Sequence, residues 1–464
     1  MKQTIHARSI GKGLLIVIVA IIAVILQVLD KTFGNTFTIS LGSIFPQADL
    51  MIFGLMVLIT ITIQFVLIKK TRRSVTVEKS KSRLGKIVLV IANVLQYSAS
   101  GILVVILFEA IFTSQYNVDL LETVVGINLI TSSVLLAILS SRLARTYRNS
   151  PSRVVLAYTV AIVMLSLNGI ITFIYVDNFL QGKPDYITSD FNPFTSYSPT
   201  ASPSLVFAYQ SIGIISFVSL WIATIFLTYH YASKSRRIKY WTIVSIPLVY
   251  FASLYIIPYL QNLDLLGMFG VGDNPTYAYT YNFFLNTVRT AGGIMFGVAF
   301  FVLSRNILHT QLKKSIIMTG IGFILLLGAN AISLIIITTY PPWGVISVTF
   351  TITGSYLIIV GLDSAAFYIA TDSSLRGIIA RSPRHEYDFL KSLGRTEAEN
   401  IVTDKVNSIS KQVYNKIQYD NLFAISSEPG NIQEYIKEVI SEAWKIDPSL
   451  LKKTKDKLSN GNHG

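Results

Sequence analysis

Long apolar stretches alternate with short polar connections through most of the chain. About ten stretches approach the roughly 20 residues that a helix needs to cross the hydrocarbon core of a bilayer. They run approximately over residues 13–28, 50–68, 87–112, 120–139, 154–176, 204–228, 241–260, 282–303, 316–339 and 345–370. The pattern therefore predicts an all-α protein, with residues 1–370 forming a polytopic transmembrane helix bundle of about ten spans.

The pattern changes after residue 370 to amphipathic helices. Ser382 and Pro383 are typical of a helix start, and Gly394 can end that helix. Thr396 with Glu399 predicts a capping box and a second helix start. Apolar stripes follow at residues 402, 406, 409, 413 and 417, and again between residues 432 and 444. Residues 371–458 are therefore expected to form a small C-terminal cytoplasmic helical module, and residues 459–464 a disordered tail.

Basic residues indicate the orientation of the bundle. Of the 25 Lys and Arg residues before position 371, 22 lie in the N-terminal segment or in alternate connections. Lys31 and Lys183 lie in the intervening connections, which also carry Asp30, and Arg289 lies within a span. Lys and Arg concentrate in cytoplasmic loops of membrane proteins. The distribution predicts a multi-pass protein of the cell membrane with both termini in the cytoplasm, an arrangement that requires an even number of spans.

Composition agrees with burial in lipid. Hydrophobic residues make up 52% of the chain and charged residues only 14%, with a mean hydropathy of +0.54. The net charge of +14 does not indicate a nucleic-acid partner, because residues 371–464 contain 14 basic and 13 acidic residues and are nearly neutral. The expected partner is the lipid bilayer. The amphipathic module could also contact a protein partner or a second copy of the chain.

Charges within apolar spans often mark functional sites, because hydrocarbon disfavours them by about 2.5 kcal/mol or more at the centre of the membrane. Glu109 and Arg289 lie at similar depths near the outer ends of their spans. We predict an ion pair between them. Such a pair could act as a gate or substrate-binding pair, or it could serve only as a specificity contact between packed helices.

Two further features of the spans concern packing and the inner membrane surface. Asp363 lies near the inner end of the last span, where its carboxylate could snorkel, cap a helix or reach a basic loop residue such as Arg305. Gly293 and Gly297 form a small-xxx-small step that predicts close helix packing.

No sequence pattern indicates catalysis, a cofactor or a metal. The chain has no cysteine, and its five histidines all lie in segments predicted to be cytoplasmic. It contains no glycine-rich phosphate loop, no Gly-x-Ser-x-Gly elbow and no His-Glu-x-x-His pair. We therefore expect no catalytic, cofactor-binding or metal-binding residues, and the protein is not expected to be an enzyme.

The last third of the chain carries a resemblance. Tyr340, Pro341, Pro342, Trp343 and Gly344 precede the last span, which contains Gly361, Leu362, Asp363, Ser364 and Ala365, and the cytoplasmic helices follow. Residues 340–410 resemble uncharacterised multi-span membrane proteins of ammonia-oxidising archaea. The resemblance implies an archaeal cell-membrane location and assigns no functional residue.

Two functions remain open. The unbroken route from the last span into the amphipathic helices favours a sensory or scaffolding protein that couples the membrane domain to the cytoplasm. The alternative is a secondary transporter of a small solute, favoured by the number of spans and by the intramembrane charges.

Overall fold

The computed structural model describes residues 2–36, 46–74, 83–188, 202–234, 237–262, 275–305, 307–337, 340–381 and 386–420. Fourteen helices and two short strands occur within these residues. The helices are α1 (Lys2–Thr36), α2 (Pro46–Ser74), α3 (Arg83–Thr113), α4 (Val118–Asn149), α5 (Arg153–Leu180), α6 (Pro203–Lys234), α7 (Arg237–Asn262), α8 (Pro275–Arg305), α9 (Thr310–Gly328), α10 (Ile332–Ile337), α11 (Val345–Val348), α12 (Phe350–Thr371), α13 (Ser373–Arg381) and α14 (Glu386–Asp420). The strands are β1 (Gln115–Asn117) and β2 (Tyr186–Thr188).

The described residues contain nine segments that are long and apolar enough to cross a membrane. Two of these segments join a long helix to a short one, over Thr310–Ile336 and Val345–Thr371. The prediction of an all-α, multi-pass bundle is therefore confirmed. The side chains of α7 are described only from residue 237 to residue 253, so the tenth span stays a prediction.

The bundle has an apolar outer surface and a central helix. Met51, Leu55 and Leu58 lie on one face of α2 and are exposed, as expected for side chains that contact lipid rather than protein. In contrast, 94% of the most apolar stretch of α12 is buried inside the protein, against 33% for α1. Helix α12 packs against α9, α4, α2, α3 and α14. It is therefore the central helix of the bundle.

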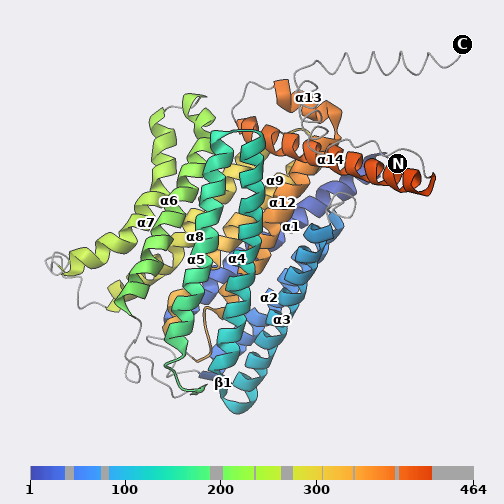
Figure 1. Cartoon of the computed structure of the whole chain (residues 1–464). Helices are drawn as coiled ribbons and strands as arrows, with labels where there is room; N and C mark the ends of the chain where they lie inside the picture. The colour runs from blue at the N-terminus through green and yellow to red at the C-terminus, as the bar shows by residue number, and fades with distance from the viewer. Residues whose placement is uncertain are drawn as a thin grey trace, which may run out of the picture.

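A short two-stranded antiparallel sheet, formed by the segments before and after the helical hairpin of α4 and α5, closes one end of the bundle, which we call the hairpin end (Figure 1). Strands β1 and β2 pair antiparallel, with Tyr116 opposite Ile187, and both of these side chains are fully buried. The Asn117 side chain caps α4 by accepting from the backbone N–H of Asp119 and of Leu120. The three extended residues in each of these connections were not anticipated, because such short strands carry little periodicity.

Helices α13 and α14 lie at the opposite end, the tail end, together with the N-terminal end of α1 (Figure 1). Helix α14 packs against α12, α4, α6 and α5. It continues without a break through Gly394, so the prediction that this glycine ends a helix is wrong. A Cβ atom at Gly394 would collide with the side chain of Ile369 in α12. The glycine therefore permits close approach of two helices.

The predicted capping box at Thr396 and Glu399 is also wrong, because both residues lie inside α14. Glu399 instead accepts hydrogen bonds from Asn149 Nδ2 at 3.1 Å and from Arg395 Nε at 3.2 Å. Asn149 belongs to α4, so Glu399 connects α14 to the membrane bundle. The second amphipathic stripe, near residues 432–444, and the predicted disordered tail at 459–464 lie outside the described residues.

Candidate functional site

Two charged residues of α1 lie inside the bundle, contrary to expectation. The sequence places Lys31, together with Asp30, in a polar connection after the first span. The structure extends α1 to Thr36, and the side chains of Asp30 and Lys31 are 0% and 1% exposed. The prediction that Lys31 lies in a connecting loop is therefore wrong. The helix continues because both side chains find polar partners within the protein.

Asp30 holds the start of a short helix. Its Oδ1 accepts from the backbone N–H of Gly344 at 3.0 Å, and its Oδ2 accepts from that of Ser347 at 2.8 Å. These groups belong to the first turn of α11, where a helix leaves N–H groups without partners and carries partial positive charge. Gly344 has a φ of 91°, in the left-handed region that favours glycine. The carboxylate thus stabilises a helix start within the bundle.

Lys31 and Gln27 satisfy the opposite end of another helix. Lys31 Nζ donates to the carbonyl oxygen of Gly328 at 2.7 Å and to Thr290 Oγ1 at 3.0 Å. Gln27 Nε2 donates to the carbonyl oxygen of Leu325 at 3.1 Å. Gly328 and Leu325 lie in the last turn of α9, where helix carbonyl groups are short of intrahelical partners and cations are favoured. The carbonyl oxygen of Leu325 also accepts from the backbone N–H of Ala329 at 2.9 Å. Helix α1 therefore offers an anion to a helix start and a cation to a helix end.

Arg289 of α8 lies next to this charged pair. Its Nη1 donates to Asn330 Oδ1 at 3.0 Å, and its guanidinium carbon lies 5.9 Å from the ring centroid of Tyr209. Its Nη2 lies beside Gly213, where a Cβ atom would come within 2.8 Å of that nitrogen. Thr290, the next residue of α8, accepts from Lys31 Nζ at 3.0 Å. The charged cluster, as we name Asp30, Lys31 and Arg289, therefore carries two basic groups and one acidic group.

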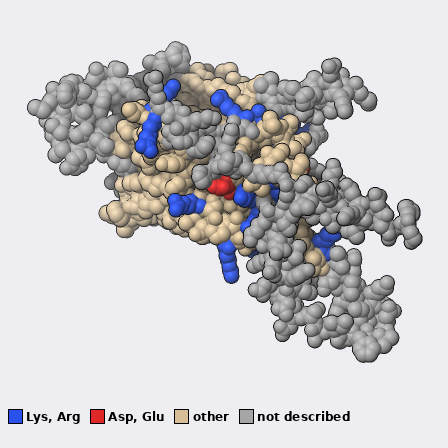
Figure 2. Space-filling view, turned by 90° about the horizontal axis from the view of Figure 1, so that it is seen from above, with Lys and Arg blue, Asp and Glu red and all other residues tan. Residues whose placement is uncertain are grey.

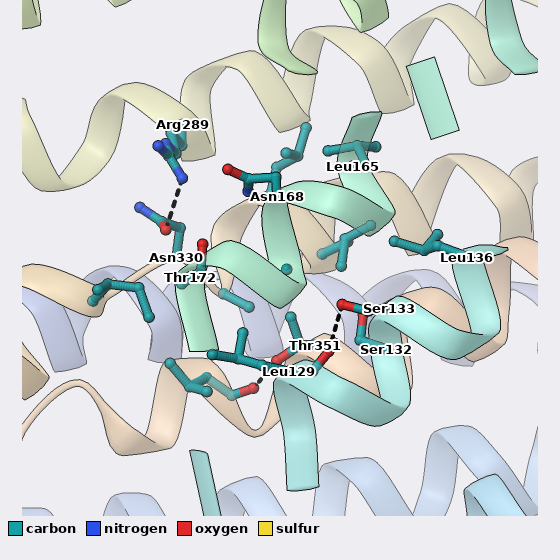
Figure 3. Close-up of a pocket in the computed structure, with 16 residues that line it drawn as sticks. Leu129, Ser132, Ser133, Leu136, Leu165, Asn168, Thr172, Arg289, Asn330 and Thr351 are labelled. Atoms are coloured by element: carbon teal, nitrogen blue, oxygen red, sulfur yellow. Dashed lines mark hydrogen bonds between the residues drawn. The ribbon is translucent and has the colours of Figure 1, made fainter. Parts of the chain in front are cut away.

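A cavity of about 60 Å³ adjoins Arg289 between α4, α5, α9 and α12. Figure 3 shows polar atoms of Arg289, Asn330, Asn168 and Thr172 gathered at one end of it. At the other end lie Ser132, Ser133 and Thr351. Asn168 Oδ1 and Thr172 Oγ1 are buried and have no hydrogen-bond partner among the described residues. Buried polar atoms of this kind normally have a partner, so these two mark a place that a further group can occupy.

Polar side chains also meet at the middle of the bundle. Gln96 Nε2 donates to Gln64 Oε1 at 3.0 Å, and Gln64 Nε2 donates to Thr349 Oγ1 at 2.8 Å. Thr353 Oγ1 donates to Gln96 Oε1 at 3.2 Å. These bonds join α2 and α3 to the start of α12. Elsewhere along α12, the hydroxyl groups of Ser355 and Ser132 share a hydrogen bond of 2.5 Å.

The structure does not bring Glu109 and Arg289 together, so the predicted ion pair does not form among the described residues. Glu109 Oε2 instead accepts from the backbone N–H of Asn117 at 2.9 Å, next to β1. Helix α3 packs against α2 and α4, whereas α8 packs against α9, α7, α1 and α6. The two residues share a depth along their helices but lie in different parts of the bundle, because depth does not determine which helices are neighbours.

Asp363 lies at the tail end of α12 and forms an ion pair there. Its Oδ2 accepts from Arg142 Nη1 of α4 at 2.5 Å, rather than from the predicted Arg305. The side chains of Arg142 and Asp363 are 38% and 17% exposed. A second cavity, of about 250 Å³, adjoins this pair between α4, α12 and α14. The pair thus lies where the tail helix joins the bundle.

Gly293 and Gly297 lie where α8 packs closely on α9. A Cβ atom at Gly293 would come within 2.9 Å of Leu327 Cβ, and one at Gly297 would lie 2.5 Å from the carbonyl oxygen of Gly320. Close packing of these helices brings the end of α9, and with it Asn330, next to Arg289. The two glycines therefore help to position the charged cluster.

Lys183, predicted to lie outside the spans, is partly buried at the hairpin end. Its Nζ donates to the carbonyl oxygen of Ile336, in α10, at 2.7 Å. Partial removal of the ammonium group from water lowers the pKa of Lys183 to about 8. Lys183 therefore connects the segment after α5 to the short helix α10.

One sequence signal could have revealed the charged cluster. Gln27, Asp30 and Lys31 are spaced by three and four residues, which places them on one face of a helix. No signal identifies their partners, which are hundreds of residues away. Among the described residues, no group of three or more His, Cys, Asp or Glu side chains could hold a metal ion.

No protein-family model, no curated protein and no solved structure matches this chain. The resemblance to archaeal membrane proteins therefore stays a prediction.

Proposed function

We propose that this protein is a sensor or scaffold of the archaeal cell membrane in which α12 couples the buried polar side chains of the bundle to helix α14 in the cytoplasm. The position of α12 is the observation that carries the proposal. This helix is buried along its length and contacts both the polar interior and the tail helix. The proposal includes ten spans, two cytoplasmic termini and no catalytic step.

The charge of the tail end supports its placement in the cytoplasm. Figure 2 views the molecule from this end and shows several Lys and Arg side chains with little Asp or Glu. Arg145 and Arg148, near the end of α4, are among the exposed residues. Basic residues favour the cytoplasmic side of a membrane.

Contacts along α12 support the coupling. Toward its start, Thr353 bonds to Gln96, and Ser355 bonds to Ser132. Toward its end, Asp363 pairs with Arg142, and Ile369 lies directly against Gly394 of α14. A helix that packs against two regions can transmit a displacement from one region to the other. A shift of α12 would therefore move the residues against which α14 packs.

A single introduced cysteine can test the coupling, because the natural chain contains none. Ala398 of α14 is 6% exposed, so a cysteine there reacts with a maleimide only when the helix opens. We expect Arg289→Gln in the charged cluster to change this reaction rate, and Arg305→Gln, at an exposed arginine, to leave it unchanged. A cysteine at the exposed Val402 is the reactivity control. Equal rates at Ala398 in all backgrounds would refute the coupling.

The scaffolding part of the proposal requires a partner for the tail. Affinity purification in mild detergent, with the full chain and with a chain ending at Ala370, should recover a protein partner or a homo-oligomer only with the full chain. Recovery of the same proteins with both chains would contradict a role for the cytoplasmic helices.

A secondary transporter of a small solute is the second candidate. The specific observation in its favour is the interruption between α9 and α10, where carbonyl groups in the last turn of α9 accept from Lys31 and Gln27. Interrupted helices with their ends near the substrate are common in transporters. Solute flux into vesicles containing the purified protein, kept after removal of α14, would favour transport over sensing.

A further inference from the structure

We propose that the cavity beside Arg289 binds one small monovalent anion, such as a halide. The inference deepens the proposed function and rests on it, because it names a ligand class for the buried polar side chains that α12 is proposed to couple to α14. It concerns binding alone, however, and can be tested without reference to α14.

The first argument is the balance of charge. Asp30 directs both of its oxygens to the backbone of α11, and Lys31 donates to two neutral oxygens. Arg289 donates to a neutral amide oxygen of Asn330. No Asp or Glu lines the cavity among the described residues. A guanidinium inside a membrane span is strongly disfavoured without a counter-charge. The site therefore needs one more negative charge, which an anion in the cavity would supply.

The second argument is the set of hydrogen-bond donors at the cavity. A guanidinium has five N–H donors, and one of those of Arg289 goes to Asn330. The hydroxyl group of Thr172, which is 3% exposed, has no partner among the described residues and can donate into the cavity. Asn168 reaches the same end of the cavity, as Figure 3 shows. A half-turn of its amide exchanges the oxygen for the NH₂ group, which adds a third donor.

The third argument is size. A water molecule needs roughly 10–15 Å³ measured in the same way, so about 60 Å³ has room for about four to six molecules of that size. A single halide with one or two waters fits this space, whereas a sugar acid does not. Water alone would satisfy Thr172 and Asn168 but would leave the positive charge uncompensated.

Gly213 of α6 leaves room for Arg289 and Asn168 to approach each other next to the cavity. A Cβ atom at this position would lie 2.8 Å from Arg289 Nη2 and 3.7 Å from Asn168 Oδ1. The missing side chain leaves the guanidinium and the amide facing the same space. Glycine here is therefore explained by the approach of a functional group rather than by a turn.

The test is equilibrium binding of radioactive chloride to the purified full-length protein in detergent, at constant ionic strength balanced with gluconate. We expect saturable binding that bromide displaces and gluconate does not. Absence of saturable binding to the natural protein would overturn the proposal. Displacement by gluconate as effective as by bromide would overturn it too, since gluconate exceeds the cavity.

Variants locate the site. Arg289→Gln should abolish binding, and Arg305→Gln should leave it unchanged. Thr172→Val keeps the side-chain shape and removes one hydrogen bond to a charged ligand, so affinity should fall about tenfold to a hundredfold. Asn168→Asp supplies a carboxylate beside Arg289 and should remove the need for chloride while the protein stays folded.

Size-exclusion chromatography checks that each variant folds. If Arg289→Gln does not fold, Thr172→Val and Asn168→Asp decide, and natural affinity in both would overturn the assignment. Binding that follows these expectations, with no change in the reactivity of a cysteine at Ala398, would establish the anion site and reject the coupling to α14.

Discussion

The strongest prediction concerns Asp30, which the sequence places in a solvated connection and the structure places in the interior. Asp30→Asn preserves the shape of the side chain but removes its charge and one of its two acceptor oxygens. Each oxygen accepts one backbone N–H, at 3.0 Å from Gly344 and at 2.8 Å from Ser347. The variant therefore points an NH₂ group at an N–H group in a buried site.

The magnitude follows from two overlapping losses. A hydrogen bond to a charged group contributes about 1.5–3 kcal/mol. Removing one member of a buried charged pair costs about 3–5 kcal/mol, because the remaining charge, here Lys31, stays buried without compensation. The losses share the same carboxylate and do not add. We expect the free energy of unfolding to fall by about 3–5 kcal/mol.

The assay is reversible unfolding in mixed detergent micelles. A second measurement uses size-exclusion chromatography to detect aggregation after heating. Asp185→Asn is the matched control, because Asp185 is exposed at the hairpin end, and it should change stability by less than about 0.5 kcal/mol. Equal stability of the two variants would refute the burial of Asp30. The double variant with Lys31→Met should lose less than the sum of the two single losses, because it leaves no unpaired charge.

Three further predictions follow from the packing and the charges. Gly394→Ala should weaken the docking of α14 by about 1–3 kcal/mol through overpacking. In the control Gly101→Ala, where nothing lies within 4 Å of the added Cβ atom, α3 should be unchanged or more stable by up to about 1 kcal/mol. Limited proteolysis and unfolding measure both effects. A double-mutant cycle on Arg142 and Asp363 should give a coupling energy of about 1 kcal/mol or less, because Arg142 is 38% exposed. Stability should rise between about pH 8 and pH 10.5, where the unfolded chain retains the Lys183 proton that the folded chain has lost, and Lys183→Met should flatten this rise in pH-dependent unfolding.

Each of these expectations has a contrary outcome. Faster proteolysis of α14 in Gly101→Ala than in Gly394→Ala would contradict the close contact with Ile369. A coupling energy well above about 1 kcal/mol would contradict the expectation that solvent screens this partly exposed pair. An unchanged pH slope in Lys183→Met would mean that another group causes the rise.

The sequence was sufficient for the helices, for a physical reason. A bilayer interior offers no hydrogen bonds, so an apolar segment must satisfy its backbone internally, and length and composition then decide that it is helical. The helices α2, α5 and α6 could therefore be predicted directly from the sequence. The location of Asp363 at the end of the last span also followed from position alone, although its partner did not.

Only the tertiary structure decided which polar groups meet. Asp30 bonds to Gly344 across more than 300 residues of chain, and nothing local to either residue records that contact. For the same reason Glu109 and Arg289, at similar depths, do not pair, and Gly394 lies in a helix interior rather than at its end. Local sequence determines how a segment satisfies its own backbone. The neighbours of a buried charge depend on how all the helices pack, because in a membrane bundle shape and a few hydrogen bonds select those neighbours.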